Sequence, residues 1–144
     1  MIGKIIKFQT NGDERGSLIA IENKHNIPFD IKRVYYLFDT KEKIRRGFHA
    51  HRKLKQLCIC VHGSCTFLLD DGTKKEHFEL NSPNEGLLLE GLVWREMYDF
   101  SADCILMVLA DAYYDERDYI REYSDFLNLI KKKDYNYEKN TYIF

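Results

Sequence analysis

Short apolar runs separated by polar turns fill most of the first 112 residues. The runs cover residues 4–9, 17–22, 33–38, 56–61, 65–69, 77–80, 86–89 and 104–110. The breaks between them are rich in Gly, Asp and Asn, and the Asp-Asp-Gly sequence at 70–72 is a strong hairpin signal. Many short strands at this spacing predict an all-β sandwich or barrel.

The period of the pattern changes in the last third of the chain. Aromatic and aliphatic residues recur there at helical spacing: Tyr119, Tyr123, Phe126, Leu127 and Ile130. This spacing predicts one C-terminal helix at about 116–132, with its apolar stripe packed against the barrel. Three lysines at 131–133 suit the negative end of the helix dipole, so we place the end of the helix there.

A chain of 144 residues has the size of a single domain. We expect a barrel over about 1–112, then the helix, then a tail over 134–144. The tail carries four more aromatic residues, Tyr135, Tyr137, Tyr142 and Phe144. It is too aromatic to be merely solvated, so we expect it to pack on another surface.

The charge balance bears on the partners of the protein. Lys and Arg total 22 and Asp and Glu total 23, a net charge of −1 with neutral histidines. This balance argues against a nucleic-acid or an anionic-membrane partner, since both need a basic surface. No apolar run approaches the roughly 20 residues of a membrane span. The N-terminus is interrupted by lysines and is too short for a secretory signal, so we expect a cytoplasmic protein.

Four cysteines stand at positions 58, 60, 65 and 104, without a CxxC pair. Cys58 and Cys60 lie two apart in an apolar run, so they share one face of a strand. A thiolate metal site is one interpretation of this set. We favour the other, in which the cysteines are small buried hydrophobic residues in a reducing compartment.

The strongest chemical signal is the sequence Arg-Arg-Gly-Phe-His-Ala-His at 45–51. In a strand, His49 and His51 point to the same side. If the strand is continuous, Leu57, Ile59 and Val61 line the same interior. Two imidazoles on one inward face beside two arginines predict a functional site, whereas a lone histidine is usually structural.

This stretch resembles the first sequence motif of the cupin superfamily, G-x5-H-x-H-x3,4-E-x6-G, which belongs to a small β-barrel of the jelly-roll type. His49 and His51 occupy the two histidine positions, and Gly63 occupies the final glycine position. Gln56 replaces the acidic ligand, and Lys43 replaces the first glycine. The spacing fits, but one of the metal ligands is lost.

The second cupin motif, P-x-G-x2-H-x3-N, is altered as well. Leu89 stands for the proline and Trp94 for the third metal-binding histidine. A transition metal needs three or four fixed N, O or S ligands, and an indole N–H cannot serve as one. We therefore expect no metal and no cofactor, with histidines that act as proton-transfer groups.

Taken whole, the chain resembles the nucleotide-sugar 3,4-ketoisomerases (FdtA/WxcM-like), which act on dTDP-4-keto-6-deoxy-D-glucose. The likeness lies in residues 13–18, 45–51, 61–65, 69–72, 94–97 and 110–115. It implies a homodimer of metal-free cupin barrels with exchanged N-terminal strands, and a dTDP-linked 4-keto-6-deoxyhexose in the barrel mouth. It also implies a role in making 3-amino-3,6-dideoxy sugars of surface polysaccharides, with a pyridoxal-phosphate aminotransferase as the next enzyme.

The residues present can support that reaction. A base removes the C3 proton beside the C4 carbonyl, an enediol forms, and a proton is delivered to C4. We assign His51 as the principal base and His49 as the second shuttle, and the reverse assignment stays open. The candidates for stabilising the negative charge of the enediolate are Arg45, Arg95 and Tyr35. Arginines also suit the pyrophosphate, and Arg46 and Arg15 are further candidates for binding it. Trp94 or Tyr98 could pack on the sugar or thymine ring.

Several of these residues also have a purely structural interpretation. Tyr35 is as easily a core residue, and Trp94 could fill the space that a metal would occupy. Strand alternation sends either Trp94 or Arg95 inward, not both. Asp111 and Asp115 could orient a histidine, but we favour a place in the turn before the helix.

The sequence is also compatible with three functions other than that of a ketoisomerase. A dTDP-sugar 3,5-epimerase uses similar carbon-acid chemistry but pairs its base His with a buried Asp and uses a Tyr acid, and the sequence shows no obvious Asp partner. The others are a metal-dependent cupin oxygenase and a non-catalytic sugar-binding cupin. The configuration of the product at C4, gluco or galacto, is left open.

Overall fold

The protein is described by a computed structural model that covers residues 2–141. Two five-stranded sheets form its body, and their paired strands run antiparallel. The first sheet has the order β1 (Lys4–Lys7), β9 (Glu85–Leu89), β6 (Gln56–His62), β11 (Ile105–Ala110) and β4 (Arg33–Leu37). The second has the order β12 (Tyr119–Ile120), β5 (Arg46–His51), β10 (Trp94–Tyr98), β7 (Cys65–Asp70) and β8 (Lys75–Leu80).

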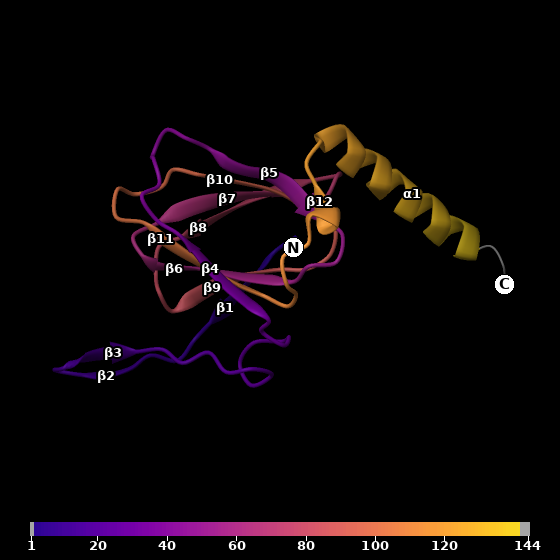
Figure 1. Cartoon of the computed structure of the whole chain (residues 1–144). Coiled ribbons are helices and arrows are strands. Elements are labelled where there is room, and N and C mark those ends of the chain that lie inside the picture. The colour runs from indigo at the N-terminus through magenta and orange to yellow at the C-terminus, as the bar shows by residue number, and fades with distance from the viewer. Residues whose placement is uncertain (1, 142–144) are drawn as a thin grey trace.

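The two sheets face one another and enclose an apolar core, as Figure 1 shows. Phe67, Leu69, Leu89, Phe100 and Leu106 are fully or almost fully buried between them. Strand alternation sends every second residue of each strand into this space. The predicted all-β jelly roll with one C-terminal helix is therefore confirmed.

The inward face of β6 differs from the one we predicted. Leu57 and Ile59 pack on the outer side of the first sheet against Phe8 and neighbouring N-terminal residues, and Val61 is exposed. The inward residues are those at positions 56, 58 and 60. Our prediction was wrong because β5 and β6 belong to different sheets, so side-chain parity does not carry across the turn between them.

The cysteines are buried, as predicted. The Sγ atom of Cys60 lies 3.3 Å from that of Cys65 and 3.9 Å from that of Cys104. All three lie in the apolar core, near the end of β6 remote from Gln56. Cys58 lies between this cluster and Gln56 on the inward face of β6.

The C-terminal segment differs from the single helix predicted at 116–132. It begins with a 3-10 turn, η1 (Glu116–Asp118), continues as β12 and becomes helical only in α1 (Tyr123–Thr141). Residues 119–120 hydrogen-bond to β5, and this edge pairing overrides their helical spacing. The lysines at 131–133 therefore lie in the middle of α1 and not at its end.

The predicted packing of the tail is not observed up to residue 140. Tyr135 and Tyr137 lie on α1 and are strongly exposed, where α1 projects beyond the barrel (Figure 1). Tyr142 and Phe144 lie outside the described residues. Within residues 2–141, no helix is long and apolar enough to cross a membrane.

The N-terminal segment leaves the barrel after β1. Residues 11–18 form a separate hairpin of β2 (Asn11–Asp13) and β3 (Gly16–Leu18), whose residues are exposed. Figure 1 shows this hairpin extending away from the two sheets. A two-stranded hairpin of this length has too little apolar contact to be stable alone.

Candidate active site

Strand β5 carries the two histidines into the space between the sheets, as predicted. The ring centroids of His49 and His51 are 4.9 Å apart, and the rings meet edge to face. Ala50, between them, is buried on the opposite side of the strand against the helix-facing cluster. The alternation of side chains thus gives both imidazoles one common space.

A β-bulge in β5 adjusts this placement. The pairing with β10 shifts between Arg95 and Glu96, so that Phe48 is the extra residue and turns outward. Gly47 has φ 93°, and a Cβ atom there would lie 2.9 Å from the carbonyl oxygen of Arg95. Only glycine allows this close approach without strain.

His51 is held by a carboxylate that the sequence analysis missed. Its Nδ1 atom lies 2.9 Å from Oδ2 of Asp118, at the end of η1. The other carboxylate oxygen accepts the backbone N–H of Lys53, and the backbone carbonyl of Asp118 accepts that of Arg52. Since the carboxylate accepts at Nδ1, that nitrogen carries the proton and Nε2 keeps its lone pair.

The Nε2 atom of His51 is buried and has no hydrogen-bond partner among residues 2–141. His51 as a whole is 1% exposed. A buried nitrogen acceptor without a partner carries a desolvation cost, and such groups mark functional sites. The geometry is that of an oriented general base, with one nitrogen held and the other free to accept a proton.

A guanidinium lies in the same interior. Arg95 is buried, and its Nη1 donates to Oε1 of Gln56 while its Nη2 donates to the carbonyl of Val93 at 3.0 Å. Gln56 in turn donates to the hydroxyl of Tyr35 at 2.9 Å. No carboxylate among the described residues forms an ion pair with Arg95. The interior thus holds a positive charge without a direct anionic partner.

Burial and this charge shift the pKa values of both imidazoles downward. The pKa of His49 falls to about 4, first because of burial and then because of the Arg95 charge. The pKa of His51 is also lowered, by burial, Arg95 and His49, against the opposing effect of Asp118. Burial raises the pKa of Tyr35 to about 12. At neutral pH both histidines are therefore neutral bases and Tyr35 is a neutral phenol.

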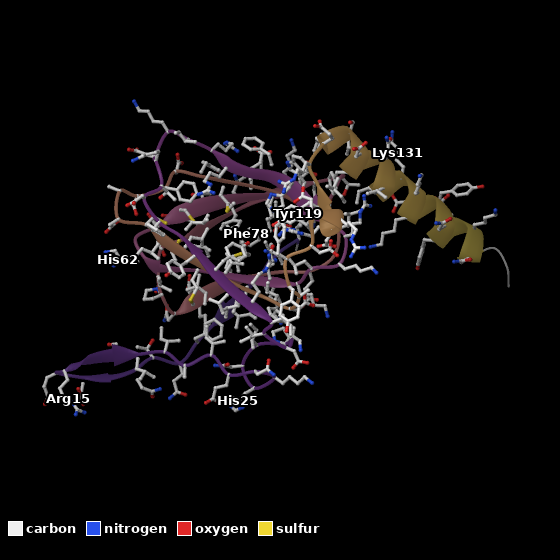
Figure 2. The ribbon with its side chains drawn as sticks, viewed as in Figure 1. Arg15, His25, His62, Phe78, Tyr119 and Lys131 are labelled. Carbon is white, nitrogen blue, oxygen red and sulfur yellow. The ribbon has the colours of Figure 1, made fainter. Side chains whose placement is uncertain are left out.

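Tyr119, which is labelled in Figure 2, lines two cavities that lead to the imidazoles. Its ring centroid is 4.4 Å from that of His51 and 5.1 Å from that of His49. On one side lies a cavity of about 380 Å³ that reaches His49, and on the other a cavity of about 200 Å³ that reaches His51. Tyr119 and Arg33 line both cavities.

The larger cavity is basic and aromatic. Its lining includes Arg33, Tyr35, Arg46, Tyr114 and Arg121. Arginine forks at the mouth of a pocket bind phosphate oxygens in pairs. Of the predicted arginines, Arg46 and Arg95 are thus brought to the imidazoles by the fold.

Three of the other predicted residues lie on the outer face of the second sheet. Trp94 packs at 5.2 Å on the ring of Tyr123 in α1, and its Nε1 donates to Glu96. The guanidinium of Arg45 lies 4.0 Å from the ring centre of Tyr98 and forms an ion pair with Glu96. Trp94 therefore does not fill the place of a metal; Arg95 faces inward in its stead.

Arg15 lies at the tip of the exposed hairpin, remote from the imidazoles within one chain (Figure 2). Its guanidinium pairs with Asp13 in the same hairpin. In this structure the chain does not bring Arg15 to its own imidazoles.

Four residues at the imidazoles or their cavities were not predicted as site residues: Asp118, Tyr119, Arg33 and Arg121. Asp111 and Asp115 occupy turns, as we favoured: Asp111 accepts the backbone N–H of Lys55, and Asp115 caps η1. Asp118 is 67 residues from His51 in sequence. The helical spacing of Tyr119 concealed the short strand that brings it to β5, so no local signal marked either residue.

The donor set at the imidazoles does not fit a divalent metal. The third position of the cupin ligand set holds Gln56, whose carbonyl oxygen is bonded to the Arg95 guanidinium. A fixed positive charge next to the ligands opposes a bound cation. In the described part of the chain, Cys60, Cys65 and Cys104 are the group of three donors close enough to hold an ion, and they lie apart from the histidines.

Two neutral imidazoles, one oriented by a carboxylate, beside a buried guanidinium in a jelly-roll barrel form an arrangement that suits acid–base chemistry. The chain belongs to the WxcM-like, C-terminal family (FdtA), whose model matches residues 1–131. The predicted family and the predicted enzyme class, an isomerase, are thus confirmed.

Similar proteins share about half of the aligned sequence, and those with solved structures share this fold. A TDP-4-oxo-6-deoxy-alpha-D-glucose-3,4-oxoisomerase of Aneurinibacillus thermoaerophilus is 55% identical over 132 residues, 92% of this chain and 95% of that protein. A 3,4-ketoisomerase of Helicobacter canadensis has a TM-score of 0.89 at 47% identity and covers 91% of this chain and 98% of its own. A histidine-to-asparagine variant of the 3,4-ketoisomerase QdtA from Thermoanaerobacterium thermosaccharolyticum, in complex with TDP-4-keto-6-deoxyglucose, has a TM-score of 0.89 at 46% identity, covering 91% and 95%.

Proposed function

We propose that the chain is a sugar 3,4-ketoisomerase that converts a TDP-linked 4-keto-6-deoxyhexose to the 3-keto isomer. The observation that carries this proposal is the unpartnered, buried Nε2 of His51, whose Nδ1 is held by Asp118. The 3,4-ketoisomerases named above supply the substrate class, a TDP-linked sugar. Burial keeps both imidazoles neutral at neutral pH, as a general base requires.

The proton transfers balance without a cofactor. The base removes the C3 proton, which the C4 carbonyl makes acidic, and a 3,4-enediol forms. A proton is then delivered to C4, and the hydroxyl proton passes from O3 to O4, so that the ketone ends at C3. We assign the first transfer to His51 and the second to His49.

The negative charge of the enediolate needs fixed donors in the barrel. Arg95 supplies a buried positive charge without a carboxylate beside it. A charge held in place before the reaction stabilises the transition state without reorganisation. Tyr35 stays protonated because its pKa is about 12, so it adds a neutral O–H donor.

The pyrophosphate fits the mouth of the larger cavity. Arg33, Arg46 and Arg121 converge there. The cavity places these arginines in front of His49, at the open end of the barrel. A nucleotide diphosphate held there directs its sugar toward the imidazoles.

We also propose a homodimer in which the 11–18 hairpin is exchanged between chains. The hairpin is exposed on one chain and carries Arg15, which one chain cannot bring to its own site. Covering the hairpin with a partner explains how so short a ribbon stays ordered.

The experiment is to incubate the purified chain with TDP-4-keto-6-deoxyglucose in D₂O and to follow the sugar by NMR. A 3-keto product with deuterium at C4 is expected. Inversion at C5 with the ketone still at C4 would identify a 3,5-epimerase instead. The epimerase is worth testing because Asp118 is an aspartate beside the base His51, and no such aspartate was predicted from the sequence. An unchanged sugar would leave only a sugar-binding cupin.

A further inference from the structure

The distal part of α1 lies beyond the residues that the family model matches. The family model ends at residue 131, and the oxoisomerase relative aligns over 132 residues. Phe126, Leu127 and Ile130 hold the first half of α1 against the barrel, but residues 131–140 are all exposed. This extension projects from the body, and Figure 2 labels Lys131 at its start.

A helix that is polar on all sides needs either many side-chain pairs along its surface or a second surface to bridge to, and the extension shows a pair of this kind, Tyr135 with Lys139. Residues 131–141 contain no Leu, Ile, Val or Met, so the extension has no apolar seam for a second helix. Its order therefore calls for a polar partner surface.

One face of the extension is basic and aromatic. Lys131, Tyr135 and Lys139 follow one another at i, i+4 and i+8, and Lys132 lies beside them. The ammonium group of Lys139 lies 5.7 Å from the ring centre of Tyr135. At about 100° per residue, this face is centred roughly 150° from the packed face of α1, so it points away from the barrel.

The near-neutral charge of the whole chain hides an uneven distribution. Four of the 22 basic residues but only two of the 23 acidic residues lie in 131–144. The segment therefore carries +2 and residues 1–130 carry −3, with neutral histidines. Lysines together with aromatic residues are typical of helices that lie on anionic lipid surfaces, and the described part of this segment carries both.

We propose that the basic face of the α1 extension, formed by Lys131, Lys132, Tyr135 and Lys139, binds an anionic lipid surface. The lysines lie against the phosphate headgroups, and the ring of Tyr135 enters the interface. The packed half of α1 holds the barrel to this anchor, with the imidazole site on other elements.

The test is co-sedimentation of the full chain with vesicles of phosphatidylcholine alone and of phosphatidylcholine with phosphatidylglycerol at 7:3. Binding is expected only to the mixed vesicles and is expected to disappear at high salt. The variant K131E/K132E/K139E should bind at least about 100-fold more weakly, because each lysine contributes about fivefold.

The matched control is K41E/K43E/K75E, which makes the same charge change at exposed lysines of the barrel. It should bind vesicles like the wild type, and both variants should keep the wild-type turnover, which separates this proposal from the proposed function. Equal binding to both vesicle types, no binding, or an equal loss in the control overturns the proposal. The proposal is also overturned if the helix variant differs from the wild type in oligomeric mass. It is overturned as well if the same lysines bind a single-stranded oligonucleotide in preference to the vesicles.

Discussion

At the scale of single residues, the site depends on how a buried imidazole is kept both neutral and oriented. His51 loses the hydration that would favour its charged form, and Arg95 opposes that form further. Asp118 alone favours it, and it also selects the tautomer. The balance leaves a neutral base with its free nitrogen inside the barrel.

Replacing Asp118 by Asn tests this positioning role. The amide holds Nδ1 less well and admits the wrong tautomer, so we expect kcat to fall about 100-fold or more while KM changes little. Because the Asp118 charge raises the pKa of His51, its removal should also move the acid limb of kcat/KM to lower pH. Asp115→Asn, a change in an exposed capping residue, is the control and should stay within about threefold of the wild type. An Asp118→Asn enzyme with wild-type kcat would contradict the role.

The pH dependence of kcat/KM of the wild-type enzyme follows from the lowered pKa values of the two histidines. An ordinary histidine base would lose activity below about pH 6.5. Since the pKa of His49 is about 4 and that of His51 is also lowered, kcat/KM should stay flat from pH 8 to about 5.5 and fall only below that. An inflection near 6.5 would show that the imidazoles are solvated.

The pH dependence of the free energy of unfolding has the opposite sign to that of a protein stabilised by a salt-bridged histidine. The depressed pKa values mean that the unfolded chain binds more protons than the folded one between about pH 6.5 and 4. The contribution of the neutral histidines is therefore complete above pH 6.5 and is lost as pH falls toward 4.

At the scale of elements, α1 consists of two parts with different roles. Its first half covers the outer face of the second sheet, where Trp94 packs on Tyr123 and Phe126. The residues of its second half are exposed up to residue 140. The hydrophobic spacing identified the first half and understated the length of the helix, because it follows apolar positions and the extension has no aliphatic ones.

Two substitutions in α1 separate these parts. Phe126 is fully buried, so Phe126→Ala should reduce the free energy of unfolding by about 3 kcal/mol or more. Tyr135 is 62% exposed, so Tyr135→Ala should change it by no more than about 0.5 kcal/mol. Denaturant titration measures both. Equal losses would mean that the extension is packed in solution.

At the scale of the whole molecule, the hairpin exchange that we propose would make the active unit a dimer. One chain would then supply the histidines and the other would supply Arg15. A mixture of two inactive variants can therefore rebuild intact sites, which a set of independent monomers cannot do.

We predict that Arg15→Ala and His51→Asn, each strongly impaired alone, regain activity when refolded together. Half of the dimers are then mixed and each has one intact site, so about a quarter of the wild-type activity is expected. Sedimentation analysis of the refolded mixture checks that dimers have formed. The activity of each variant refolded alone is the baseline. No recovery from a mixture that does form dimers would place Arg15 outside the site.

The sequence by itself determined most of the barrel strands, the fold class and the common direction of His49 and His51, because these follow from local alternation and from a motif within seven residues. It also determined that the ligand set of a metal cupin is incomplete. Only the tertiary structure decided that Arg95 faces inward, that Trp94 packs under α1, and that Asp118 and Tyr119 reach the imidazoles. Those contacts join residues up to 67 positions apart, and they depend on sheet order and on one bulge, which leave no periodic trace in the chain.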